Sequence, residues 1–337
     1  MKKMKKLLSA VLAATMLLTL LAGCQDKDAE AQPPEGADAA QEETAQEPQY
    51  NAEKIAITYV KSPLNVPSIV EKDKKFFEKA YESFGLPVEY SNLTAGPEQT
   101  QALASGDLQF LNAVGATSAI LAASNGNDIK IISMYSRSPK AFKMFTCRDD
   151  IHSAEDLKGK KIVGPKGTIL HELMVTYLKN AGLTEQDVEF VSMGIPESMA
   201  ALANKEADCA LLAGPAAYNA EKEGNTVVTS GEGLVDATIV VATSQKFYDE
   251  NKVLVDTFLD TQKQTLQYME DNYDEVMEIA AKETELDLDA VKEMYEMYDF
   301  DMTIRDSDVE SMKSTEQFLF DNGMIENHVN VEDLVIR

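Results

Sequence analysis

Short apolar runs alternate with helical patterns from Tyr50 onward, and this alternation limits the possible folds more than any other feature of the chain. The apolar runs predict strands at 55–60, 88–90, 108–114, 129–134, 142–147, 161–163, 188–193, 210–212, 227–228 and 238–242. Helical periodicity predicts helices at 66–84, 97–105, 116–124, 168–181, 196–205 and 214–223, and the chain is almost wholly helical after Val253. This order predicts an α/β protein in which mainly parallel sheets are flanked by helices, followed by a helical C-terminal segment.

The N-terminal residues have the composition of a secretory signal. Four lysines lie within the first six residues, and the apolar run Leu7–Leu21 that follows is short for a bilayer span, which needs about 20 residues. The sequence Leu21-Ala22-Gly23-Cys24 resembles the lipobox of bacterial lipoproteins, in which the cysteine is lipidated. We therefore expect a lipoprotein signal peptide at 1–23 and an acyl (palmitate-type) anchor on Cys24. The alternative is an uncleaved N-terminal anchor helix.

Residues 24–49 are expected to form a disordered acidic tether behind the lipidated cysteine. The segment is rich in Ala, Gln, Glu, Asp and Pro and has no apolar periodicity, so it cannot offset the entropy cost of ordering. A tether on a lipid anchor predicts an extracytoplasmic protein that is attached to the cell membrane and remains mobile above it.

Charge and cysteine usage exclude several classes of function. The chain has 31 Lys+Arg against 57 Asp+Glu, a net charge of −26, so no basic surface is predicted for nucleic acid or for an anionic membrane. Cys147 and Cys209 both lie in apolar runs, which favours buried free thiols, although the spacing leaves a disulfide open. The histidines are scattered and no metal-ligand spacing occurs, so we expect no metal and no cofactor.

Five strand-to-helix turns contain small residues that expose backbone N–H groups. They are Thr94-Ala-Gly96-Pro97, Val114-Gly115-Ala116-Thr117-Ser118, Pro165-Lys166-Gly167-Thr168, Met193-Gly194-Ile195-Pro196 and Ala213-Gly214-Pro215. In open parallel sheets, ligands bind beyond the carboxyl ends of the strands, beside helix N-termini. Because such turns occur in both halves of the chain, we expect two facing rims around one cleft.

The order of several motifs between about 55 and 245 resembles one protein family. The motifs are Gly96-Pro-Glu-Gln99, Gln101-Ala-Leu-Ala-Ser-Gly-Asp-Leu108, Asp128-Ile-Lys-Ile-Ile-Ser133, Ser153-Ala-Glu-Asp-Leu-Lys-Gly-Lys-Lys161 and Gly164-Pro-Lys-Gly-Thr168. They resemble the type II periplasmic (solute) binding proteins of ABC importers, of the nitrate/sulfonate/taurine type and the thiamine-precursor type, here in a lipoprotein form. The resemblance implies a two-lobed fold that closes on a ligand by a hinge motion. Lobe 1 would comprise 50–138 and 239–337 and lobe 2 would comprise 139–238, with crossovers near Ser136–Ala141 and Val235–Ile239.

The position of the turns and the resemblance together suggest a set of ligand-binding residues. They are Ser62, Asn65, Gly96, Gly115, Ala116 and Thr117 in lobe 1, and Lys166, Gly167, Thr168, His171, Gly194, Ile195 and Gly214 in lobe 2. Structural alternatives stay open for several of them. Thr117 and Thr168 are also plausible helix N-caps, Lys166 a solvated loop lysine and His171 an exposed side chain. Tyr59, Tyr135 and Tyr218 fit the core or the hinge better than a stacking role.

The class of ligand follows less directly. Helix N-termini with Lys166 and His171 favour a small organic anion such as a sulfonate or carboxylate, and Arg137 near the first crossover is the arginine available for a bidentate clamp. A pyrimidine, thiamine or flavin precursor held by Glu98, Glu197 and tyrosines is the alternative.

The resemblance implies a monomeric substrate-binding protein that delivers its ligand to a membrane permease. Two other classes of function remain open, a ligand-sensing module of a membrane receptor and an enzyme on the same fold. The sequence shows no Ser-His-Asp or Cys-His signature and no partner for His171 as a base, so we predict no catalytic residues.

Overall fold

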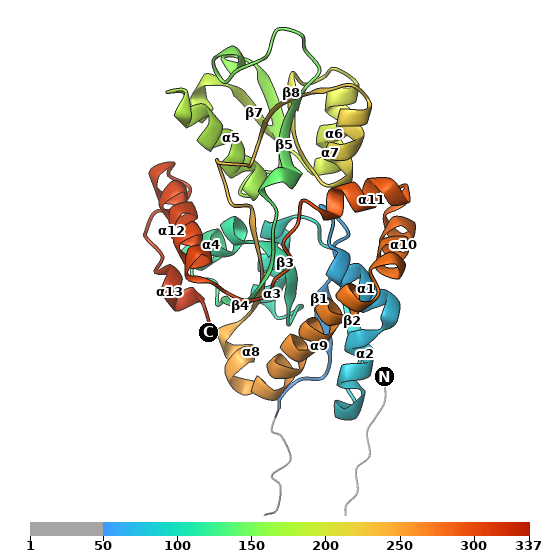
Figure 1. Cartoon of the computed structure of the whole chain (residues 1–337). Helices are drawn as coiled ribbons and strands as arrows, with labels where there is room; N and C mark the ends of the chain where they lie inside the picture. Colours follow the sequence, from blue (N-terminus) through green and yellow to red (C-terminus); the bar gives the residue numbers. More distant parts are fainter. Residues whose placement is uncertain (1–49) are drawn as a thin grey trace, which may run out of the picture. The chain divides into compact units, whose positions relative to one another are not determined.

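The structure is a computed structural model that describes residues 50–337 (Figure 1). The predicted signal peptide at 1–23, the lipidated Cys24 and the tether at 24–49 lie outside the described residues. Within 50–337, no helix combines the length and apolarity that a bilayer span requires.

One part of the molecule contains a two-stranded sheet, β2-β1, and beside it a three-stranded sheet of order β3-β10-β4. Its strands are β1 (Ile55–Thr58), β2 (Val88–Ser91), β3 (Leu111–Gly115), β4 (Lys130–Arg137) and β10 (Thr238–Thr243). β1 pairs in parallel with β2, and a parallel bridge between Ile57 and Phe110 connects β1 to the start of β3. β10 lies between β3 and β4 and is antiparallel to both. We call the part of the molecule that contains these five strands lobe 1.

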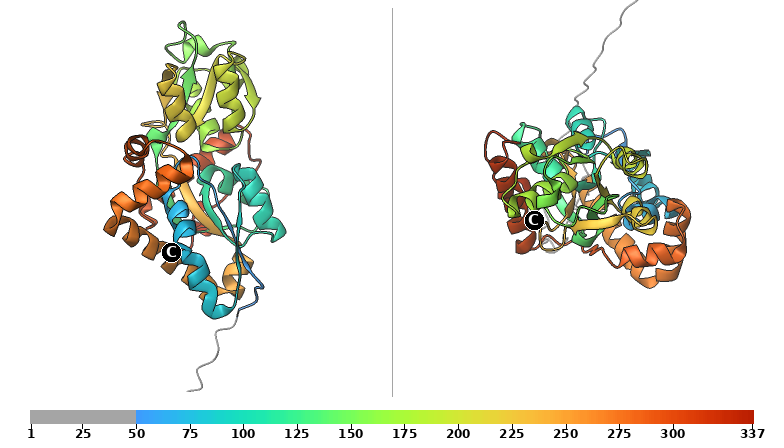
Figure 2. Two further views of the ribbon diagram at one scale, coloured as in Figure 1. Left: turned by 90° about the vertical axis from the view of Figure 1, so that its right-hand side faces the viewer. Right: turned by 90° about the horizontal axis from the view of Figure 1, so that it is seen from above.

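The other part of the molecule contains a five-stranded sheet of order β7-β6-β8-β5-β9. Its strands are β5 (Phe142–Thr146), β6 (Lys161–Gly164), β7 (Glu189–Ser192), β8 (Cys209–Ala213) and β9 (Thr226–Ser230). β6 is parallel to β7 and β8, whereas β5 is antiparallel to β8 and β9. We call the part that contains this sheet lobe 2, and Figures 1 and 2 show its green and yellow elements grouped together.

The two antiparallel strands mark where the chain passes between the lobes. A 3₁₀ turn, η2 (Pro139–Ala141), leads from β4 into β5, and the chain returns after β9 through residues 231–237 into β10. β5 therefore begins at the lobe interface and runs away from it, whereas β6 and β8 end there. The predicted α/β fold is confirmed, but the sheets are mixed and not mainly parallel: among the described strands, β10 and β5 are antiparallel to both of their neighbours, whereas the pairs β1–β2, β6–β7 and β6–β8 are parallel.

Helices cover both faces of each sheet, as predicted. They are α1 (Val66–Lys74), α2 (Phe76–Tyr81), α3 (Gly96–Ser105), α4 (Ala116–Ser124), α5 (Ile169–Asn180), α6 (Ile195–Ala203), α7 (Pro215–Lys222), α8 (Gln245–Glu250), α9 (Lys252–Asp271), α10 (Tyr273–Thr284), α11 (Leu288–Tyr295), α12 (Asp306–Asp321) and α13 (Val331–Leu334). Short 3₁₀ turns are η1 (Glu82–Phe84), η3 (Glu155–Leu157) and η4 (Glu185–Asp187). The C-terminal segment is helical and packs on lobe 1, where the Phe258 ring of α9 stacks on Phe77 and Phe110 with centroids 4.6 and 4.0 Å apart.

Two local predictions are refined by the structure. The helix predicted at 66–84 is broken at Lys75, whose φ of 56° ends α1 in the left-handed conformation. The sequence did not reveal this break, because the apolar periodicity continues across it and lysine rarely adopts that conformation. In the described chain Cys147 and Cys209 are free thiols, which confirms the preferred prediction, although only Cys209 is fully buried.

Candidate ligand-binding cleft

The carboxyl ends of strands from both sheets meet at the lobe interface. Gly115 ends β3 and is the N-cap of α4, and a Cβ built on it would lie 3.4 Å from the Ile169 side chain of α5 in lobe 2. One turn further along α4, the Ser118 hydroxyl donates to the Gly167 carbonyl, with 2.9 Å between the oxygens. Two of the predicted rims, 115–117 and 166–168, therefore face each other across the interface.

A buried carboxylate also joins the lobes. Glu172 of α5 accepts a hydrogen bond on each oxygen, from the Thr117 hydroxyl at 2.7 Å and from the Thr315 hydroxyl of α12 at 2.8 Å. Burial raises the pKa of Glu172, and the two hydroxyl donors oppose that rise. Ala116 and Thr117 line a small cavity beside this carboxylate. Thr117 is thus an interlobe donor, and the N-cap of α4 is Gly115.

A second close approach lies at the N-terminus of α7. Gly214 has φ 55° and ψ −133°, and a Cβ placed on it would be 1.5 Å from the Pro63 carbonyl oxygen of lobe 1. Pro63 belongs to the turn after β1 that contains the predicted residues Ser62 and Asn65. The Asn65 side chain donates to the Val60 carbonyl at 2.8 Å, while its Oδ1 has no partner among the described residues. Three further predicted residues therefore lie at or beside the interface.

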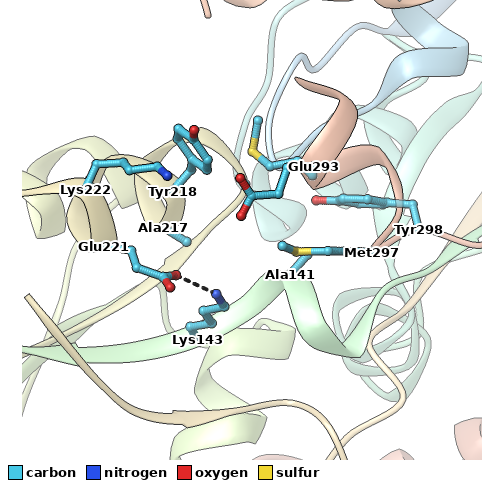
Figure 3. A pocket seen from close by; sticks show the side chains of 11 residues that line it. Ala141, Lys143, Ala217, Tyr218, Glu221, Lys222, Glu293, Met297 and Tyr298 are labelled. Atoms are coloured by element: carbon cyan, nitrogen blue, oxygen red, sulfur yellow. Dashed lines mark hydrogen bonds and ion pairs between the residues drawn. The ribbon is translucent and has the colours of Figure 1, made fainter. Parts of the chain in front are cut away.

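A small pocket opens next to Gly214, between α7 of lobe 2 and α11 of lobe 1 (Figure 3). It is lined by side chains or backbone of Ala141, Lys143, Gly214, Ala217, Tyr218, Glu221, Lys222, Glu293, Met294, Met297 and Tyr298. Of the predicted site residues only Gly214 lines it. Because both lobes contribute walls, the volume of this pocket changes when the lobes move apart.

His171 supports the rim from behind. Its ring is buried and stacks on Phe190 with centroids 4.9 Å apart. Nδ1 accepts from the Gly167 N–H at 3.3 Å, so Nε2 carries the proton toward the Glu185 carboxylate at 2.8 Å. Burial lowers the pKa of His171, against the effect of Glu185, which agrees with a neutral ring. The alternative that His171 is simply an exposed side chain is therefore wrong. Both of its ring nitrogens already have hydrogen-bond partners within the protein.

The other predicted residues of lobe 2 are less enclosed. Lys166 is exposed, and its Nζ lies 3.7 Å from a Glu185 oxygen. Thr168 is the N-cap of α5, but its hydroxyl donates to the Pro165 carbonyl and does not cap the helix. Gly194 is exposed at the N-cap of α6, and Ile195 packs against the core of lobe 2.

Two lobe 1 residues, Gly96 and Arg137, make contacts within the protein that stabilise the packing of its helices. A Cβ on Gly96 would lie 2.3 Å from the Ser118 hydroxyl oxygen, so Gly96 allows α3 to pack on α4 one layer behind the rim. Arg137 forms a bidentate pair with Asp308, through its Nε at 2.6 Å and its Nη2 at 2.5 Å. The expectation that Arg137 could clamp an anion is therefore wrong, because an aspartate of α12 already takes that place.

Sequence reasoning missed the residues that the C-terminal helices bring to the interface. Glu293 and Tyr298 reach the pocket from the end of α11 and the segment after it, and Thr315 reaches Glu172 from α12. Figure 1 shows α11 next to α7 and α12 next to α5. One sequence pattern could have pointed to Glu172. It lies three residues after Ile169, so both side chains share one face of α5, and a carboxylate on a buried face needs hydrogen-bond donors from a neighbouring element.

Comparison with known proteins places these features in context. The NMT1/THI5-like family model matches residues 63–276. The "Putative aliphatic sulfonates-binding protein" of Bacillus subtilis (strain 168) is 26% identical over 273 residues, 80% of this chain and 82% of that protein. The taurine-binding periplasmic protein of Escherichia coli (strain K12) is 28% identical over 181 residues, 54% of this chain and 55% of that protein.

A solved structure has the same fold. The alkanesulfonate-binding protein SsuA from Xanthomonas axonopodis pv. citri, bound to MOPS, aligns with a TM-score of 0.77 at 19% identity. The alignment covers 85% of this chain and 99% of that chain. This likeness confirms the predicted α/β binding-protein fold.

Proposed function

Because the chain belongs to the NMT1/THI5-like family, we propose that it is the substrate-binding protein of an ABC importer. It captures a small organic sulfonate between two lobes, closes on it by a hinge motion and delivers it to a membrane permease. The observation that carries this proposal is the meeting of the strand ends at the interface, where Ser118 contacts Gly167 and Gly214 contacts Pro63. Such turns expose N–H groups at helix N-termini, which stabilise anions.

The comparisons support a sulfonate as the ligand. The names of the two relatives given above refer to aliphatic sulfonates and to taurine. A pyrimidine, thiamine or flavin precursor is the second ligand class, and a receptor module is the second type of role. The structure gives His171 the carboxylate partner, Glu185, that the sequence did not reveal, but a role as a general base is disfavoured because its other nitrogen, Nδ1, already accepts from the Gly167 N–H.

A ligand panel tests the proposal. We expect short alkanesulfonates and aminoalkanesulfonates to raise the melting temperature of the full chain in detergent, since a ligand at 100 times its Kd stabilises by about 2.7 kcal/mol. Nitrate, carboxylates and pyrimidines serve as the comparison set. A shift with pyrimidines alone would replace the sulfonate by a heteroaromatic precursor, and turnover of any bound compound would contradict a pure binding role.

We further propose that Cys24 carries a lipid anchor that keeps the protein near its permease. The support is the Leu21-Ala22-Gly23-Cys24 sequence directly after an apolar run. We expect wild-type protein to sediment with membranes and to incorporate labelled palmitate, and Cys24→Ser to lose the label. Cys147→Ser is the matched control, which should retain it. Equal labelling of Cys24→Ser and wild type would contradict the anchor.

A further inference from the structure

The Glu172 carboxylate of lobe 2 has both of its hydrogen-bond partners in lobe 1. One oxygen accepts from the Thr117 hydroxyl of α4 at 2.7 Å and the other from the Thr315 hydroxyl of α12 at 2.8 Å. Glu172 is only 7% exposed, so the interface leaves it almost no water. Among the described residues no cation lies within ion-pair distance of this carboxylate. The lobe interface therefore contains a buried acid that has two hydroxyl donors and no counter-ion.

The charged groups near Glu172 do not supply that counter-ion. Asp236, in the segment that returns to lobe 1, lines the same small cavity, and its charge also raises the pKa of Glu172. Of the other described elements, α4 and β10 contribute no charged side chain to this cavity. The groove outside it is lined by charged residues of α5 and α12 that pair with one another, Lys179 with Asp321 at 3.3 Å and Lys313 with Glu310 at 3.0 Å. Ionised Glu172 thus places a second negative charge beside Asp236.

Separation of the lobes changes the surroundings of this carboxylate. Glu172 moves with α5 of lobe 2, whereas Thr117 and Thr315 stay with lobe 1, because α12 packs on α4 in one apolar cluster. In the open arrangement water solvates the carboxylate, and its pKa returns to the ordinary value of 4.5. In the closed arrangement burial raises that pKa. Closure therefore takes up a proton at any pH between the two values.

We infer that Glu172 is a proton-sensitive latch between the lobes, which holds the closed arrangement when the carboxyl group is neutral and loosens it when the group is ionised. A neutral carboxyl group donates from one oxygen and accepts on the other, so it keeps a hydrogen bond to each threonine hydroxyl. The ionised group keeps both bonds as well, but it is desolvated without a counter-charge. Glu172 acts on a ligand through the lobes and is a positioning residue.

Resting on the proposed function, the latch makes the affinity for a ligand depend on pH. Because the pKa is higher in the closed arrangement, the contribution of Glu172 to closure is largest at low pH and is lost as pH rises through the closed-state pKa. A ligand that binds between closed lobes is therefore held more tightly at low pH and released more readily at neutral pH.

Calorimetry with ethanesulfonate on the full chain in detergent tests the latch from pH 4.5 to 8. This probe keeps the same charge throughout, so a change in affinity comes from the protein. We expect the wild-type affinity to fall by about threefold or more, and by at most about tenfold per pH unit, since one proton is exchanged. Glu172→Gln keeps one donor and one acceptor for the two threonines. It should bind like wild type at pH 4.5 and more tightly than wild type at pH 8.

A second variant separates a proton-linked role from a merely structural one. Thr315→Val removes one hydroxyl donor and keeps the shape of the side chain. It should weaken binding more at pH 8 than at pH 4.5, because a hydrogen bond to a charged group contributes more than one to a neutral group. Equal weakening at both pH values would contradict the latch. Glu206→Gln, an exposed glutamate of lobe 2, is the matched control and should keep the wild-type pH profile.

Small-angle scattering of the ligand-free protein distinguishes failure of the latch from failure of the proposed function. We expect wild type to be more open at pH 8 than at pH 4.5, and Glu172→Gln to be equally closed at both. Identical pH profiles of affinity and of lobe separation for wild type and Glu172→Gln would overturn the latch while sulfonate binding stood. A pH-dependent lobe separation, with no binding of ethanesulfonate or of any other sulfonate, would overturn the proposed function and leave the latch in place.

Discussion

Gly214→Ala is expected to prevent closure of the lobes and to weaken ligand binding by about a hundredfold, which corresponds to about 3 kcal/mol. The added Cβ would lie 1.5 Å from the Pro63 carbonyl oxygen, and a backbone atom cannot move aside as a flexible side chain can. The backbone of Gly214, with φ 55° and ψ −133°, is also one that a residue with a Cβ avoids. Because the clash joins two lobes, opening the interface relieves it without unfolding either sheet.

The affinity is measured by calorimetry with the sulfonate that gives the largest thermal shift, and the lobe separation by small-angle scattering. Gly224→Ala is the matched control. Gly224 also has a positive φ, 87°, yet a Cβ there meets no described atom within 4 Å. We expect Gly224→Ala to lose a little stability and to bind as wild type does. If Gly214→Ala also binds like wild type, the contact with Pro63 is not part of the closed state.

Gly214 belongs to the part of the site that could be predicted from sequence. Strand-to-helix turns with small residues were predictable, and the structure brings Gly115, Thr117, Gly167 and Gly214 to the interface. The same reasoning also selected Gly96, which permits two helices to pack. Glycine marks any close backbone approach, so its presence in a turn does not distinguish a ligand rim from a helix contact.

The walls of the pocket were beyond the reach of local patterns. Tyr298 is about 80 residues from Tyr218 in sequence, and only the packing of the C-terminal helices on both lobes brings the two into one pocket. Strand and helix periodicity reports which face of an element is buried, and it carries no information on which distant element covers that face. The order of strands and helices was therefore predictable from sequence. Of the site, the turns 115–117 and 166–168 were predictable, because each belongs to one lobe.

Lobe 1 contains a buried carboxyl group on α1. Glu71 is 1% exposed, and one of its oxygens accepts from the Asn112 side chain at 2.7 Å. Its other oxygen has no partner in the described residues, and Glu71 lines a small cavity. Asn112 in turn accepts from Gln262 at 3.0 Å, so α1, β3 and α9 share one buried polar network. No described cation pairs with Glu71 within ion-pair distance.

This environment makes the stability of the protein depend on pH. Burial raises the pKa of Glu71 from 4.5 to about 8, against the effect of the Asn112 hydrogen bond. Between these two values the unfolded chain has released the proton while the folded chain keeps it. The free energy of unfolding therefore falls as pH rises from about 4.5 to about 8, by about 3–5 kcal/mol from this group in total. Below about pH 4.5 Glu71 is protonated in both the folded and the unfolded chain, so it no longer lowers the free energy of unfolding.

Glu71→Gln should remove this dependence, because the amide is neutral at every pH and its oxygen can still accept from Asn112. We expect the variant to match wild type near pH 4.5 and to exceed it by about 3–5 kcal/mol near pH 9 in urea unfolding of the full chain. Glu82→Gln, an exposed glutamate in η1, is the matched control and should follow wild type throughout. Because all other carboxyl groups are common to the proteins compared, the difference between the curves isolates Glu71. Parallel curves for Glu71→Gln and wild type from pH 4.5 to 9 would mean that Glu71 is ionised in the folded protein, with a cation or water in the cavity beside it.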